Sequence, residues 1–219
     1  MLQEYFNPKI RGDILLRAGY TDDRQAAELL NACINDVCQA AQPKTIYRKL
    51  PIEKTEPLLA GEDVRKHLQN CSQCLIIAAT LGIGIDKLLL RAAAEDTERL
   101  LLTDIVANTA IEAFCDKFQN ELAESTFDQE NAFLTSRYSP GYGDFPLSTS
   151  AQILKILEAG KRIGLMITPN HLLTPKKSIT AVIGISAIKT PTHDCDNCAI
   201  ADTCDYNKNK RGKTDEPIS

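Results

Sequence analysis

The chain has 219 residues, of which 43% are hydrophobic and 25% are charged, and its formal net charge is -4 at pH 7. These values are typical of a globular protein with one sizeable domain, and they argue against general nucleic-acid binding, which relies on a surplus of Lys and Arg. The most apolar stretch, residues 75–85, is too short to span a bilayer. No basic and apolar leader opens the chain, so we expect a cytoplasmic protein whose eight cysteines are free thiols or metal ligands.

The first part of the chain predicts helices and two strands. Apolar residues at helical spacing, or in short runs bounded by turn residues, indicate these elements. In chain order they are helices over residues 8–20 and 21–41, an edge strand over 45–56, a short helix over 62–69 and a buried strand over 73–81. Residues 82–84 read Gly-Ile-Gly before the next helix, but they lack the third glycine and the spacing of a dinucleotide-binding loop.

A long helix over residues 96–123, preceded by a helix over 85–94, has the most informative pattern. Asp104, Asn108 and Glu112 follow one another at i+4 spacing and are expected to form a polar ridge within a wide apolar face. That face is assigned to Leu100, Leu101, Ile105, Ala107, Ile111, Phe114, Phe118 and Leu122. Because polar groups in a packed face need partners, either neighbouring backbone or a buried water satisfies the ridge, or Glu112 meets the ammonium group of a ligand.

Residues 137–147 combine an Arg, two Tyr, a Phe, two Pro and two Gly in a chain poor in aromatic residues. Pro140-Gly141 predicts a type II turn, in which the glycine takes a positive φ. Arg137 can pair bidentately with a carboxylate, and Tyr142 can offer its ring face to a cation. S-adenosylmethionine, which has a carboxylate, an ammonium and a sulfonium group, fits these side chains. The alternative is a structural Pro-Gly turn beside a surface Arg.

The rest of the chain predicts a helix, two strands and a polar tail. The helix begins at Ser148 or Thr149 and ends near residue 159, and strands over 162–168 and 178–188 flank a proline-containing turn over 172–177. The order of elements predicts an α+β fold with a mainly antiparallel, bent sheet and helices packed against it. We expect residues 1–189 to form one domain with a helical N-terminal part over 1–42.

The tail, residues 190–219, is nearly free of large apolar residues and contains Cys195, Cys198 and Cys204 in a Cys-x2-Cys-x5-Cys arrangement. Clustered thiolates are the ligands of zinc or of an iron–sulfur cluster, so these three cysteines are candidate metal ligands. His193, Cys71 or Cys74 could supply a fourth ligand, or one position could stay open. The pair Cys71 and Cys74 leads into a core strand, which favours structural thiols, and the end of the tail is expected to be disordered.

The segment Arg137-Tyr138-Ser139-Pro140-Gly141-Tyr142 resembles the Arg-x-x-x-Gly-Tyr motif of the activation domain of cobalamin-dependent methionine synthase. The resemblance covers about residues 92–184 and includes Ile111-Glu112-Ala113-Phe114. It implies that S-adenosylmethionine is held by Arg137 and by backbone near Ser139 and Gly141, with help from Tyr142, and that Glu112 holds its amino group. The family's acidic ligand residue near the start of the domain has no counterpart that we can place.

The resemblance also implies a function without a general acid or base. Such a domain reactivates cob(II)alamin on a cobalamin-binding module by reductive methylation, with an electron donor protein as second partner, and the chain would be the short form of this subunit rather than a complete enzyme. Its own contribution would be placement of the reactants. Two alternatives stay open: a metal-bearing or cluster-bearing electron-transfer partner of another corrinoid methyltransferase, and a docking module without affinity for small molecules.

Overall fold

The computed structural model of the protein describes residues 2–20, 24–55, 58–127 and 132–188. Its order begins with the helices α1 (Pro8–Arg17) and α2 (Arg24–Ala40), strand β1 (Lys44–Pro51), helix α3 (Glu62–His67) and strand β2 (Cys71–Thr80). Helices α4 (Ile83–Glu95) and α5 (Thr97–Leu122) and strand β3 (Phe133–Leu134) follow. Helices α6 (Thr149–Leu157) and α7 (Ala159–Ile163) and strands β4 (Met166–Ile167), β5 (Leu173–Thr174) and β6 (Ser178–Ser186) complete it.

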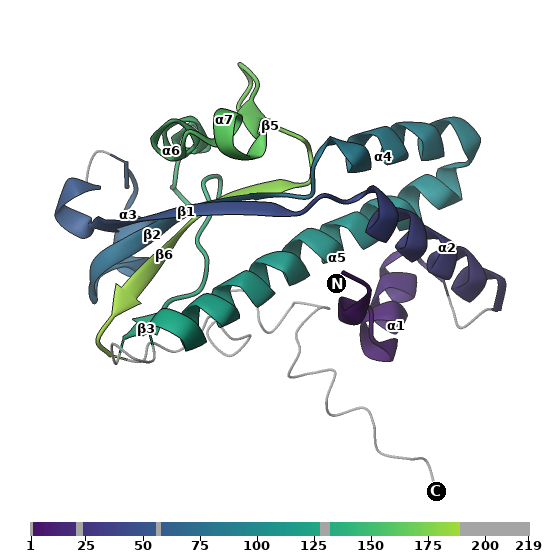
Figure 1. The fold of residues 1–219 in the computed structure, drawn as a ribbon, viewed down its shortest axis with the longest axis horizontal. Helices are drawn as coiled ribbons and strands as arrows, with labels where there is room; N and C mark the ends of the chain where they lie inside the picture. The colour runs from purple at the N-terminus through teal and green to yellow at the C-terminus, as the bar shows by residue number, and fades with distance from the viewer. Residues whose placement is uncertain (1, 21–23, 56–57, 128–131, 189–219) are drawn as a thin grey trace, which may run out of the picture.

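The main sheet has the order β1-β2-β6-β3, and each neighbouring pair is antiparallel. The two inner strands, β2 and β6, are continuous apolar runs because both of their faces are covered. On one face, Ile76 and Val182 pack with α3, α6 and α7, and on the other, Ile77 and Ile183 pack beneath the end of α5. Figure 1 shows this arrangement, with α6 and α7 on one side of the sheet and α5 crossing the other. The predicted α+β fold with an antiparallel sheet is confirmed.

The two N-terminal helices pack against the part of α5 that includes Leu102, Val106 and Ala110. Ile14 of α1, Leu30 and Ile34 of α2 and Val106 of α5 belong to one buried cluster. Each fully buried aliphatic side chain of this kind contributes about 1.5–3 kcal/mol relative to an exposed one. In the described part of the chain, no helix combines the length and the apolar character needed to cross a membrane.

Three local predictions differ from the structure. The edge strand expected over residues 45–56 ends at Pro51, and Ile52–Lys54 forms a 3-10 turn. Residues 162–168 were expected to form a strand, but α7 extends to Ile163 and only Met166–Ile167 is extended. Burial of Ala159 and Ile163 draws this segment into a helical turn, which ends where Gly164 takes a φ of 71°. The turn expected over residues 172–177 contains the short strand β5. The division of the chain at residue 189 stays a prediction, since the tail lies outside the described residues.

Candidate functional site

Helix α5 brings three polar side chains to one face beside the sheet. Asp96 caps the helix by accepting hydrogen bonds from the backbone N–H groups of Glu98 and Arg99. Glu112, Asp116 and Gln119 lie four and then three residues apart, so they point from the same side of the helix. The side chains of Glu112 and Asp116 are 61% and 65% exposed.

The expected position of the polar ridge within the apolar face is wrong. The buried side of α5 is centred on Leu102, Val106 and Ala110, and Leu101 is 45% exposed. Packing against α1, α2 and α4 turns this side inward and leaves the ridge at the solvent edge. There Asp104 and Asn108 each accept a hydrogen bond of 2.7 Å from the ammonium group of Lys177, which satisfies the first half of the ridge.

The loop that follows β3 is anchored at both ends. Tyr138 exchanges two backbone hydrogen bonds of 2.9 Å with Val182 of β6. Phe145 is 1% exposed and packs in the cluster beneath α6. Between these anchors, the backbone N–H of Tyr142 bonds to the carbonyl of Ser139 at 3.3 Å and Gly141 has a φ of 97°. Both features are those of the predicted type II turn.

A pair of aspartates fastens the same loop to the start of α3. The Asp144 carboxylate accepts hydrogen bonds from the backbone N–H groups of Glu62 and Asp63, at 2.6 and 3.1 Å. These two bonds lower the pKa of Asp144. In return, Asp63 accepts a bond of 3.3 Å from the backbone N–H of Asp144. Gly143 is required at this contact, because a Cβ there would lie 2.2 Å from the Asp63 carboxylate and its φ is 52°.

We expect Asp144→Asn to loosen this attachment and to lower the midpoint of thermal unfolding at neutral pH, since an amide oxygen accepts these bonds more weakly. The lowered pKa means that the carboxylate's contribution is complete above the ordinary value of 3.8 and is lost as the pH falls through the lower folded value. The difference in midpoint between variant and wild type should therefore shrink below pH 3.8 in calorimetric scans. Glu158→Gln, on an exposed acid of another surface, should show no such trend.

Arg137 is the centre of the polar network between the loop and α5. Its side chain is only 16% exposed. The guanidinium donates to Asp116 at 2.7 Å, to Glu112 at 3.0 Å and to Gln119 at 3.3 Å. Burial works against the positive charge, but the adjoining carboxylates, Asp116 first, outweigh it and raise the pKa of Arg137. Gln119 also donates to the carbonyl of Thr135, which ties the network to the chain entering the loop.

These residues line an open cleft of about 690 Å³ between α5, β6 and the loop, a volume within the usual range for a small organic ligand. Its lining residues are Glu112, Asp116, Gln119, Asn120, Ser136, Arg137, Tyr138, Ser139, Tyr142 and Ile179. Four of the five predicted site residues, Glu112, Arg137, Ser139 and Tyr142, thus share one cleft. The fifth, Gly141, shapes the turn and is not among the lining residues. Tyr142 is 69% exposed at the edge of the cleft, so its ring face is available to a ligand.

Sequence reasoning missed Asp116 and Gln119. A signal for Asp116 was present, because it continues the i+4 series of Asp104, Asn108 and Glu112 by one turn. The contact itself depends on where the sheet places Arg137, which lies 21 residues further along the chain.

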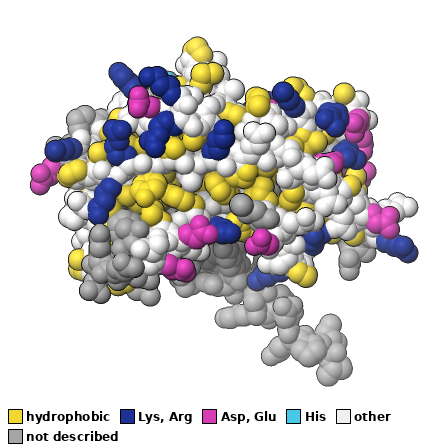
Figure 2. All heavy atoms as spheres, in the orientation of Figure 1, with side chains coloured by type: hydrophobic (Ala, Val, Ile, Leu, Met, Phe, Trp, Pro, Cys, Tyr) yellow, Lys and Arg dark blue, Asp and Glu magenta, His cyan; other side chains and the backbone are white. Residues whose placement is uncertain are grey.

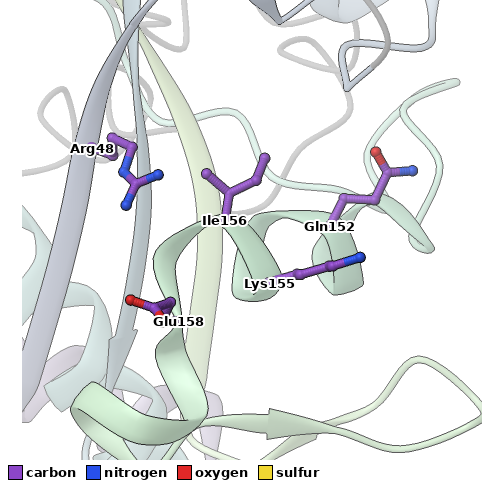
Figure 3. Close-up of a pocket in the computed structure, with 5 residues that line it drawn as sticks. All are labelled: Arg48, Gln152, Lys155, Ile156 and Glu158. Atoms are coloured by element: carbon purple, nitrogen blue, oxygen red, sulfur yellow. The ribbon is translucent and has the colours of Figure 1, made fainter.

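A second hollow, of about 600 Å³, lies between β1 and α6 (Figure 3). It is lined by Arg48, Gln152, Lys155, Ile156 and Glu158, and none of the predicted site residues is among them. Figure 2 shows Lys and Arg side chains gathered on this face of the molecule. The two hollows therefore differ in charge: two basic groups and one acid here, against one basic group and two acids in the cleft at α5.

The predicted metal ligands Cys195, Cys198 and Cys204, together with His193, lie outside the described residues. Within the ranges that the structure describes, no group of three or more His, Cys, Asp or Glu side chains could hold a metal ion. Of the two other thiols considered as a fourth ligand, Cys74 is fully buried, and its burial raises its pKa to about 11. Cys71 is half-buried, and its pKa is also raised by burial.

Comparison with known families identifies the family of this chain. The family model described as the activation domain of vitamin B12-dependent methionine synthase matches residues 50–211. The chain belongs to this family. The match is longer than the resemblance read from the sequence, residues 92–184, and includes the positions of the three tail cysteines.

Solved structures give the same fold for the activation domain. The crystal structure of the MetH reactivation domain bound to AdoHcy matches with a TM-score of 0.56 and 15% sequence identity. The match covers 82% of this chain and 70% of that chain. At this identity the likeness establishes the fold alone. A search of curated proteins gave no match to the chain.

Proposed function

We propose that this activation domain binds S-adenosylmethionine in the cleft at α5. The observation that carries the proposal is the placement of Arg137, Glu112 and Tyr142 around one cavity, with the guanidinium 3.0 Å from the Glu112 carboxylate. Arg137 would hold the ligand carboxylate, Glu112 the ammonium group, and Tyr142 the sulfonium. The backbone near Ser139 and Gly141 would bind beside them. The related MetH domain was crystallised with AdoHcy, the demethylated form of this ligand.

The function supported by this site is reactivation of a cobalamin-dependent methionine synthase. In that reaction an electron donor protein reduces the cob(II)alamin of the partner module, and the methyl group of S-adenosylmethionine passes to the cobalt, which leaves S-adenosylhomocysteine. This chain would contribute orientation: the Arg137 network fixes the amino-acid end of the donor, so that the methyl group to be transferred faces the open side of the cleft. Calorimetric titration with S-adenosylmethionine tests the proposal, and the absence of measurable binding would overturn it.

The tail cysteines carry a separate proposal, a zinc or iron–sulfur site formed by Cys195, Cys198 and Cys204. The supporting observation is their Cys-x2-Cys-x5-Cys spacing in a segment with few large apolar residues. Elemental analysis of anaerobically purified protein distinguishes the two metals. Iron with sulfide would favour the electron-transfer alternative or a combined function, zinc alone would indicate a structural site, and the absence of both would contradict the proposal.

Thiol labelling at pH 8 provides a further prediction. Burial raises the pKa of Cys115 to about 12 and that of Cys74 to about 11, so neither forms an appreciable fraction of reactive thiolate. Both should remain unmodified by iodoacetamide in the folded protein and become fully modified in denaturant, as measured by peptide mass spectrometry. Rapid labelling of either thiol before unfolding would contradict the packing described here.

A further inference from the structure

Asp116 is a second acid in the cleft, and the proposed roles of Glu112 and Arg137 leave it unassigned. Its carboxylate is 2.7 Å from the Arg137 guanidinium, nearer than that of Glu112 at 3.0 Å. It lines the cleft and is 65% exposed, so it is held by Arg137 on one side and open to a ligand on the other. The Asp116 carboxylate is thus held in place by Arg137 while part of it remains accessible to a ligand.

The charges around the cleft do not balance. Among the described residues that line it, two carboxylates, Glu112 and Asp116, face one guanidinium, Arg137, and the others carry no formal charge. Two neighbouring lysines do not correct the difference, because Lys177 is paired with Asp104 at 2.7 Å and Lys117 with Glu121 at 3.6 Å. The lining of the cleft therefore has one surplus negative charge at neutral pH.

We infer that Asp116 makes this cleft selective for the methyl donor over its demethylated product. The inference rests on the proposed binding of S-adenosylmethionine. At neutral pH the donor has one net positive charge, because its sulfonium adds to a zwitterionic amino acid, whereas the product thioether is neutral overall. When the ligand carboxylate joins Arg137, it competes for donors that Asp116 and Glu112 now occupy. Glu112 then faces the ligand ammonium, and Asp116 faces the sulfonium.

The selectivity for the donor would favour release of the product after methyl transfer. Loss of the methyl group as a cation equivalent removes the sulfonium charge, so the attraction to the surplus carboxylate disappears while the contacts to the amino-acid end persist. The product is then held less tightly than the donor, and the cleft can exchange one for the other. For partly solvated unit charges a few ångströms apart, this difference amounts to about fivefold to tenfold in affinity.

The test is calorimetric titration of the full chain with S-adenosylmethionine and, separately, with S-adenosylhomocysteine. Wild type should bind the donor about fivefold to tenfold more tightly than the product. Asp116→Asn keeps an acceptor oxygen for Arg137 but removes the charge, so it should weaken donor binding by that factor and leave product binding nearly unchanged. Raising the salt concentration should reduce the selectivity of wild type but not that of the variant.

Glu98→Gln is the matched control, because it removes an exposed acid from the first turn of the same helix, outside the lining of this cleft. It should leave both affinities unchanged. Equal weakening of donor and product by Asp116→Asn would overturn the inference and reduce Asp116 to a support for Arg137, as would equal affinities in wild type. Failure of wild type to bind either compound would instead overturn the proposed function, and the inference with it.

Discussion

Replacing Arg137 with Ala should raise the Kd for S-adenosylmethionine by roughly 30-fold or more, because removing one member of a largely buried, hydrogen-bonded charge pair costs about 2–5 kcal/mol. The guanidinium is 16% exposed and is already oriented by Asp116 and Glu112, so a ligand carboxylate meets it without much further ordering. Arg137→Lys should recover only part of the affinity, since an ammonium group keeps the charge but cannot form the planar, two-pronged contact. Calorimetric titration of the three proteins measures both effects.

Arg162→Ala is the control for this experiment. Arg162 is an exposed residue of α7 on the other side of the sheet, so the substitution removes the same side chain without touching the cleft. It should leave the affinity unchanged. The partners that Arg137→Ala leaves behind, Glu112 and Asp116, are both well solvated, so the variant should remain folded. A folded Arg137→Ala protein with wild-type affinity would rule out the proposed site.

Gly84→Ala should destabilise the fold by about 1–3 kcal/mol, the usual cost of forcing an additional methyl group into a packed contact. A Cβ at this position would lie 2.2 Å from the carbonyl oxygen of Ala40, where the start of α4 passes the end of α2. The obstacle is backbone rather than a flexible side chain, so one of the two helices must shift. Chemical denaturation of the full chain, followed by circular dichroism, measures the loss in free energy of unfolding.

Gly12→Ala tests whether the effect comes from contact or from the loss of a glycine. Gly12 also lies inside a helix, α1, but a Cβ there would meet nothing within 4 Å. Alanine should therefore stabilise the protein by about 0.5–1 kcal/mol through its higher helix propensity. If both substitutions changed the stability in the same direction and by the same amount, the close approach of α4 to α2 would be wrong.

The fold could be read from the sequence where an element is long and its pattern is uniform. The apolar runs of β2 and β6 predicted strands and the spacing in α2 and α5 predicted helices, although the buried face of α5 was placed wrongly. Prediction was wrong where packing decides between alternatives. The strand predicted over residues 162–168 is wrong at its start, because burial of Ile163 against the sheet keeps residues 162 and 163 in helix α7. The Gly-Ile-Gly segment shows the same limit, because the contact of Gly84 with Ala40 is visible only once the two helices are placed.

The sequence predicted which residues could bind a ligand, but not which of them would contact one another. Arg137, Tyr142 and the turn between them stand out by residue type, the i+4 polar ridge pointed to Glu112, and the resemblance to a known family implied the same residues. Their meeting in one cleft depends on β6, which holds Tyr138 and so brings the loop to α5. Asp116 was overlooked because an acid on a helix surface has many solvated positions open to it. Only the location of Arg137 turns this one into a partner.

The packing of α1 and α2 against α5 has a practical consequence for the design of shorter fragments of this protein. The family match begins at residue 50, yet α1 and α2, which precede it, shield Leu102, Val106 and Ala110 of α5 from solvent. A fragment trimmed to the boundary of homology would also lose most of β1 and leave β2 as the exposed edge of the sheet. Such a fragment should aggregate, so the smallest usable expression product is defined by the neighbours of α5 rather than by the extent of recognisable ancestry.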